Sequence, residues 1–124
     1  MRYYIDTCVW IDFIEGRTNI DLFTECILED HTVILSYPLQ KELGKYVHSE
    51  QLTMILALLS AKELIERVDV FEHDKKEALH LSAQRNIPFA DALHAVLARN
   101  NDALLITRDK HFLKLRDICA IRLF

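Results

Sequence analysis

The chain has 124 residues, enough for one domain (residues 1–124), and 51% of them are hydrophobic, which excludes a disordered chain. Its net charge of −4 excludes a protein that binds a polyanion by bulk positive charge, so such a ligand would need a local basic patch or a bound cation. Three widely spaced cysteines, Cys8, Cys26 and Cys119, favour reduced core thiols over a disulfide framework.

Neither a targeting segment nor a membrane span is expected. The charged residue Asp6 comes too early for a signal peptide. The longest apolar stretch, residues 54–59, is far shorter than the roughly 20 residues that span a bilayer. We therefore expect a soluble, cytoplasmic protein.

Short β-type runs alternate with helical patterns along the first half of the chain. We expect a strand at residues 2–6 and a helix at 9–15 that ends at Gly16. Asn19 is expected to cap a second helix that runs to about residue 29. The apolar face of this helix would consist of Ile20, Phe23, Ile27 and Leu28. A strand at 32–36 follows, and Pro38 then opens a helix through residue 46.

The second half of the chain continues the alternation. The pattern predicts a long helix at 49–65, a strand at 68–71 and a helix capped by Asp74 that runs to about residue 85. Further elements are expected in the order helix 89–100, strand 103–107, helical turn 111–115 and strand 120–124.

Strands separated by helices pair in parallel and place helices on both faces of one sheet. The run Leu104-Leu105-Ile106 is apolar without alternation, as expected of a strand covered on both sides. The sequence therefore predicts an α/β fold, a three-layer α/β/α sandwich with a central parallel sheet of about five strands.

Four acidic residues fall near the carboxyl ends of these strands, where open parallel sheets bind their ligands. Asp6 ends the first strand, and Asp109 comes two residues after Thr107 ends a later one. Glu42 lies on the helix after the second strand, and Asp91 lies in the first turn of the helix that follows the second proline. We expect the four carboxylates to converge at one edge of the sheet.

Each of these acids also has a purely structural interpretation. Asp6 could cap the following helix, and Asp91 could favour the positive end of a helix dipole. Glu42, with lysines close to it on the same helix, could belong to a solvated face. Asp109 could be a turn residue.

Several carboxylates crowded together repel one another and take up protons unless a cation is present. Oxygen ligands without His or Cys favour Mg²⁺ or Mn²⁺ over zinc. Such an ion binds a phosphate, lowers the pKa of a bound water and stabilises charge on a leaving oxygen. The four acids therefore predict phosphate chemistry that depends on a divalent metal.

The residues around these acids resemble a known family. Residues 4–11, YIDTCVWI, resemble the opening strand and first acid of PIN domains. Residues 87–95, IPFADALHA, and 105–112, LITRDKHF, resemble the third and fourth acids of the family with their connecting helix. The resemblance covers nearly the whole chain. The small size and the lack of added domains resemble the compact VapC-type toxins of bacterial and archaeal toxin–antitoxin pairs.

The resemblance implies an endoribonuclease in which a metal-activated water hydrolyses single-stranded or structured RNA, leaving 5′-phosphate and 3′-hydroxyl ends. It implies Asp6, Asp91 and Asp109 as metal ligands and Glu42 as a further ligand or base. No sharp motif surrounds Glu42, and Glu25 or Glu29 stays open as an alternative second acid. The resemblance also implies a homodimer and, for the toxin subgroup, a separate antitoxin.

Other residues near the acids have weaker assignments. Thr7 and Thr107 would supply hydroxyls that orient a carboxylate or water. Arg108 and Lys110, with Lys114 and Arg116, form a modest basic cluster that either contacts RNA phosphates or is a solvated face. We interpret His94, three residues after Asp91, as a packing or helix-surface residue.

Three alternatives remain at this point. One is a PIN-like module that binds a partner without catalysis. A receiver-type signalling domain would need an Asp ending the middle strand and a Lys ending the last, whereas the expected third strand ends in Phe71-Glu72 and no Lys ends the last. A D-x-D phosphohydrolase would need an Asp where Cys8 stands.

Overall fold

The computed structural model describes residues 1–17 and 22–124, apart from the side chain of Ser49. Asn19 and Ile20, the expected cap and first apolar residue of the second helix, lie outside the described residues. The order of elements is β1 (Arg2–Ile5), α1 (Thr7–Ile14), α2 (Leu22–Leu28), β2 (Thr32–Ser36), α3 (Tyr37–Tyr46), α4 (Ser49–Ala61), β3 (Ile65–Val68), α5 (Glu72–Arg85), α6 (Phe89–Asn100), β4 (Leu104–Thr107), the 3₁₀ helix η1 (Lys110–Leu115) and β5 (Ile121–Leu123).

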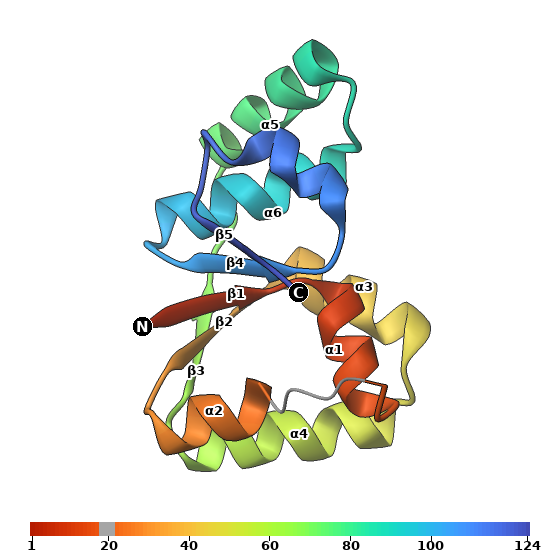
Figure 1. The fold of residues 1–124 in the computed structure, drawn as a ribbon, viewed down its shortest axis with the longest axis vertical. Coiled ribbons are helices and arrows are strands. Elements are labelled where there is room, and N and C mark those ends of the chain that lie inside the picture. The colour runs from red at the N-terminus through yellow and green to blue at the C-terminus, as the bar shows by residue number, and fades with distance from the viewer. Residues whose placement is uncertain (18–21) are drawn as a thin grey trace.

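A five-stranded parallel sheet in the order β3-β2-β1-β4-β5 forms the centre of the molecule. Helices α1, α2 and α4 cover one face, and α5, α6 and η1 cover the other (Figure 1). The predicted three-layer α/β/α fold is therefore confirmed. The connections leave β1 toward β2 and β3 on one side, and the chain later returns to β4 and β5 on the other. The carboxyl ends of β1 and β4 thus meet at the point where the strand order reverses, which is where open sheets form ligand crevices.

The core fills both sides of the central strands. Tyr4 and Ile5 of β1, and Leu105 and Ile106 of β4, have no exposed surface. Trp10 of α1 is equally buried and packs its ring against that of Phe23, with 4.5 Å between the ring centroids. Because β1 and β4 are covered on both faces, their carboxyl ends are held rigidly by the surrounding core.

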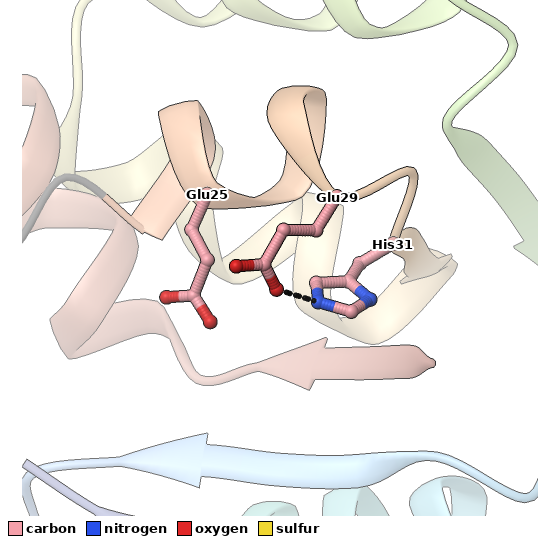
Figure 2. Close-up of side chains that lie close together, drawn as sticks. All are labelled: Glu25, Glu29 and His31. Carbon is pink, nitrogen blue, oxygen red and sulfur yellow. Dashed lines mark hydrogen bonds and ion pairs between the residues drawn. The ribbon is translucent and has the colours of Figure 1, made fainter.

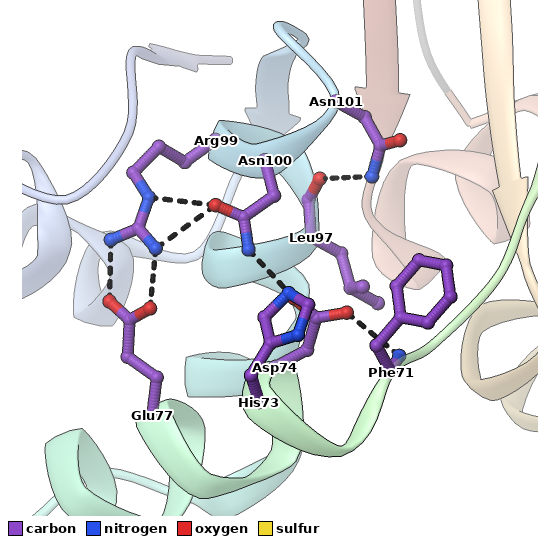
Figure 3. A network of polar contacts seen from close by, with 8 residues as sticks. All are labelled: Phe71, His73, Asp74, Glu77, Leu97, Arg99, Asn100 and Asn101. Carbon is purple, nitrogen blue, oxygen red and sulfur yellow. Dashed lines mark hydrogen bonds and ion pairs between the residues drawn. The ribbon is translucent and has the colours of Figure 1, made fainter.

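A polar network fixes α5 against α6 (Figure 3). The carboxylate of Asp74, 2% exposed, accepts hydrogen bonds from the backbone N–H of Phe71 (2.9 Å) and the side-chain amide of Asn100 (2.7 Å). Beside it, Arg99 of α6 forms a two-pronged ion pair with Glu77 of α5. The prediction that Asp74 precedes and caps this helix is wrong in position: α5 begins at Glu72 with Phe71 as its N-cap, and Asp74 in the first turn accepts from the backbone N–H of Phe71.

The predictions for residues 49–71 are partly wrong. The helix α4 ends at Ala61 instead of residue 65, because the backbone at Glu63 adopts a left-handed conformation (φ 57°). The next strand is Ile65–Val68, three residues earlier than expected. Phe71 and Glu72 therefore do not end a strand, and the end of the third strand as predicted from the sequence cannot be used to exclude a receiver domain. In the flavodoxin-like order 2-1-3-4-5 the third strand is the middle one, whereas here β1 is in the middle and β3 lies at the border, so the strand order does not fit a receiver domain.

The apolar face of α2 also differs from the prediction. Leu28 is 77% exposed, whereas Leu22, Phe23 and Cys26 are buried.

Among the described residues, no helix combines the length and the apolar character that crossing a membrane requires.

Candidate metal centre

Asp6 is held by both central strands where β1 ends. Its backbone N–H donates to the carbonyl of Ile106 in β4 (2.8 Å). One carboxylate oxygen accepts from the backbone N–H of Thr7 (2.9 Å), so the capping interpretation is correct. The other oxygen accepts from the hydroxyl of Thr107 (2.8 Å) and the thiol of Cys8 (3.2 Å). Asp6 is only 7% exposed, and these donors fix the direction of its carboxylate.

Thr107 links the first and last acids of the predicted set. Its hydroxyl has no exposed surface, donates to Asp6 and accepts from the backbone N–H of Asp109 (3.0 Å). One oxygen of Asp109 in turn accepts from the backbone N–H of His111 (2.9 Å), which caps η1. Asp109 is therefore a turn residue as well as a neighbour of Asp6. The expected orienting role of Thr107 corresponds to two hydrogen bonds of ordinary length.

Asp91 opens α6 and is affected by the other acids. Burial first, and then the negative charges of Asp6 and Asp109, raise its pKa to about 6, with a smaller contribution from Glu42. A helix N-terminus alone would stabilise the charged form and lower the pKa. Since the pKa moves upward, burial and crowding of like charges outweigh the dipole at this position.

Glu42 belongs to α3, which lies beside α1 near the carboxyl ends of the strands (Figure 1). Its carboxylate lies 3.0 Å from Nε2 of His94, and this hydrogen bond is the main cause of its lowered pKa. The hydroxyl of Thr7 lowers that pKa further, yet Thr7 Oγ1 is buried and has no hydrogen-bond partner of ordinary geometry among the described residues. Glu42 therefore does more than occupy a solvated helix face.

His94 is the residue at this edge whose contacts we did not predict. It is 1% exposed, and its Nδ1 lies 2.6 Å from the hydroxyl of Tyr4. Its spacing from Asp91 was the available signal, because residues three apart lie on the same face of a helix. Packing is therefore only part of its role.

The donor set at this edge fits a hard divalent cation. The carboxylates offer oxygen atoms only, which suits Mg²⁺ or Mn²⁺. The raised pKa of Asp91 means that, where nothing else offsets the negative charge, the site takes up a proton already as the pH falls to about 6. The buried hydroxyl of Thr7, beside Glu42 and without a hydrogen bond of ordinary geometry among the described residues, leaves a polar group available for a ligand or water.

A second cluster with metal-ligating side chains, Glu25, Glu29 and His31, lies elsewhere (Figure 2). Within the described part of the chain, it is the one group of three such residues whose ligand atoms all lie within 4.8 Å of one another, so the four predicted acids are spaced more widely. His31 precedes β2 and contacts the N-terminal amine of Met1 (3.0 Å), which places the cluster at the amino ends of the strands. Its groups already pair, Glu29 with His31 and Glu25 with Arg122.

The position of this second cluster bears on the choice of the second acid. Glu25 and Glu29 lie at the edge opposite to Asp6, and neither is among the charges that shift the pKa of Asp91. Glu42 is among them. The structure therefore favours Glu42 over the two alternatives left open by the sequence.

The basic residues next to Asp109 are exposed. The guanidinium of Arg108 lies 2.7 Å from the carboxylate of Asp12 on α1, which also faces Arg17 at 3.6 Å. Lys110 begins η1 and is likewise exposed. These side chains supply local positive charge beside the acids of an acidic protein.

Several solved structures share this fold along their full length. The structure of VapBC2 from Rickettsia felis bound to a DNA fragment from its promoter is 21% identical, with a TM-score of 0.73, and the match covers 100% of this chain and 99% of that one. VapBC-1 from nontypeable Haemophilus influenzae is 18% identical with a TM-score of 0.70, covering 99% and 98%. VapBC-5 of Mycobacterium tuberculosis, a toxin–antitoxin system, is 19% identical with a TM-score of 0.58, covering 99% and 97%.

No curated protein matches the chain in sequence. The family model described as PIN domain, however, matches residues 3–118, which include β4, all but the first residue of β1, and all four acids at the sheet edge. Together with the fold and the order of its strands, this match shows that the chain belongs to the PIN domain family.

Proposed function

We propose that the protein is a single-domain endoribonuclease that depends on Mg²⁺ or Mn²⁺. The observation that carries the proposal is the electrostatic coupling of Asp91 to Asp6 and Asp109, which lie on three separate segments of the chain. Membership of the PIN family and the position of these acids at the reversal of strand order support it.

In this proposal Asp6, Asp91 and Asp109 hold the ion, and Glu42 serves as a further ligand or as a base. The bound ion would neutralise the substrate phosphate and make water an effective nucleophile near neutral pH. Arg108 and Lys110 would contact phosphates of the RNA on either side of Asp109.

The reaction is the hydrolysis of one phosphodiester. The oxygen of water forms a bond to phosphorus, and the bond from phosphorus to the 3′ oxygen breaks, so that the products carry a 5′-phosphate and a 3′-hydroxyl. If Glu42 acts as the base, it would accept the proton of the attacking water, and the leaving 3′ oxygen would take up a proton from solvent. The carboxylate of Asp6 is already oriented by its hydrogen bonds to Thr7 and Thr107, so it would lose little orientational freedom when the ion binds.

The full-length likeness to VapBC structures supports a narrower assignment, the toxin of a toxin–antitoxin pair. On this assignment the protein acts in the cytoplasm as a homodimer, and a separate antitoxin protein blocks its site. Expression without its gene neighbours should then arrest growth. Normal growth would contradict the toxin assignment and leave the nuclease proposal intact.

The nuclease proposal is tested by RNA cleavage with Mg²⁺ or Mn²⁺ and with excess chelator. Asp6→Asn and Asp91→Asn should each lower the rate by roughly a hundredfold or more, the usual scale for losing one electrostatic group of an active site. Asp102→Asn is the matched control, because Asp102 is exposed and its positive φ suits Asn equally well. Activity in excess chelator, or full activity in both site variants, would contradict the proposal.

The non-catalytic alternative, a PIN-like module that binds a partner, makes the opposite prediction. Such a module would bind RNA or protein without producing new RNA ends under any metal condition. The same cleavage assay therefore separates the two functions.

A further inference from the structure

Glu42 is tied to the start of its own helix by a chain of buried polar groups. The backbone N–H of Leu39, in the first turn of α3, donates to Ser36 Oγ (3.3 Å). Ser36 Oγ lies 2.7 Å from the hydroxyl of Tyr4, which lies 2.6 Å from Nδ1 of His94. Nε2 of His94 lies 3.0 Å from Glu42. Tyr4, Ser36 and His94 are each at most 1% exposed, so water does not compete for the bonds among these three residues.

The chemistry of the groups determines where each proton lies. An ionised carboxylate only accepts hydrogen bonds, so Nε2 of His94 carries a proton and donates a hydrogen bond to Glu42. A neutral ring then has Nδ1 as an acceptor, which takes the hydroxyl proton of Tyr4. Tyr4 in turn accepts from the hydroxyl of Ser36. All hydrogen bonds in the chain therefore point the same way, from the first turn of α3 to Glu42.

The doubly protonated ring would leave a buried group unsatisfied. Nδ1 would then donate to Tyr4, and Tyr4 would donate to Ser36, which already accepts from Leu39. The hydroxyl proton of Ser36 would have no acceptor in this network of described residues. An unpaired buried hydroxyl is costly, so the neutral ring with its proton on Nε2 satisfies the network best.

We propose that His94, held in its Nε2–H form by Tyr4 and Ser36, is a positioning residue that fixes the carboxylate of Glu42 for its role at the metal centre. This inference rests on the proposed function, because it assumes that Glu42 acts there. One oxygen of Glu42 accepts the hydrogen bond from His94 Nε2–H. The other oxygen is then left to bind the metal ion or to accept from a water. Partners of this kind commonly orient the groups around a bound metal.

The protonation state of His94 can be observed in the ¹⁵N-labelled, metal-free protein by long-range ¹H–¹⁵N NMR. We expect one protonated and one unprotonated ring nitrogen, with the proton on Nε2. Tyr4→Phe removes the donor to Nδ1, and the ring should then populate both neutral forms. Tyr3→Phe is the control, because Tyr3 is the adjacent residue of β1 and its hydroxyl contacts Glu25 instead. A wild-type ring without a proton on Nε2 would overturn the inference.

The effect on the metal centre can be measured by calorimetric titration with Mn²⁺. His94→Leu should weaken binding by roughly tenfold or more, the scale for losing an outer partner of a metal ligand. His94→Gln, whose amide can still donate near the position of Nε2, should recover part of that loss. Circular dichroism identifies variants that fail to fold, and the wild-type NMR spectrum tests the proposal without any variant.

The outcomes distinguish this inference from the proposed function. Wild-type protein that binds Mn²⁺, together with a folded His94→Leu variant that binds it equally well, overturns the positioning role alone. Failure of the wild-type protein to bind Mn²⁺ overturns both. Weakened binding in His94→Leu with recovery in His94→Gln supports the positioning role.

Discussion

Asp91 illustrates the competition among burial, neighbouring charge and helix dipole at a single residue. It occupies the first turn of α6, where the dipole favours its ionised form, yet its pKa is raised to about 6 from an ordinary value of 3.8. In the metal-free protein near neutral pH, ionised Asp91 therefore destabilises the fold. The cost disappears once a cation offsets the charge of the site.

This leads to a prediction about stability and pH. A carboxyl group whose pKa is raised by folding contributes stability below pH 3.8, and that stability is lost as the pH rises through about 6. Asp91→Asn should therefore stabilise the metal-free protein at pH 7.5 by about 1 kcal/mol, less than the full shift implies because Asp91 is partly exposed to solvent. Urea unfolding in chelator should show no such gain at pH 4. A gain of equal size at both pH values would contradict this origin.

A second prediction concerns the hydroxyl of Thr107. Thr107→Val keeps the shape of the side chain but removes the donor to Asp6 and the acceptor for Asp109, which should cost about 1–3 kcal/mol of unfolding free energy. RNA cleavage should fall because Asp6 loses its fixed direction. Thr107→Ser retains the hydroxyl and should restore most of the activity. Wild-type cleavage by Thr107→Val would contradict a role of this hydroxyl in orienting Asp6 for activity.

Cys8 departs from the simple interpretation as a core thiol. It is partly exposed and donates to Asp6, and burial together with the negative charge of Asp6 raises the pKa of its thiol to about 11. The thiol is therefore protonated at neutral pH and can act as a hydrogen-bond donor. Asp6 lies only two positions before Cys8, but the spacing of cysteines in the sequence does not reveal this contact.

At the level of the elements, local sequence signals predicted several helices and strands with their bounds. The strand Thr32–Ser36 and the helix Phe89–Asn100 agree with the prediction residue for residue, because β-branched residues and a preceding proline mark their limits. The end of α4 was not predictable in this way. Glu63 adopts a positive φ without the Gly or Asn that usually signals it, so the helical pattern appeared to continue.

Asp91 and His94 lie on α6, which packs against α5. A third prediction tests the polar contacts that hold these two helices together. Asp74→Ala leaves the backbone N–H of Phe71 and the amide of Asn100 without their acceptor, and should cost about 2 kcal/mol of unfolding free energy. Glu72→Ala, also in the first turn of α5 but exposed, should change stability by less than about 0.5 kcal/mol. Urea denaturation of both variants provides the comparison, and equal effects would contradict a specific role for Asp74.

At the scale of the whole molecule, the order of the strands determines which acids meet. Asp6 and Asp109 are far apart in the sequence, yet β1 and β4 are neighbours and bring them to one hydroxyl, that of Thr107. The parallel fold made this convergence predictable from sequence, since all strands end at the same edge. The contacts of His94 and the burial of the Thr7 hydroxyl beside Glu42 could not be predicted, because they depend on the directions of side chains from several elements.

The central claim is that this edge of the sheet holds a divalent cation that RNA cleavage requires. Cleavage of single-stranded RNA by chelator-treated protein, before and after Mn²⁺ is added, tests it most directly. We predict no cleavage before the addition, and products with 5′-phosphate and 3′-hydroxyl ends after it. Equal cleavage in both conditions, or products ending in a 2′,3′-cyclic phosphate, would contradict it.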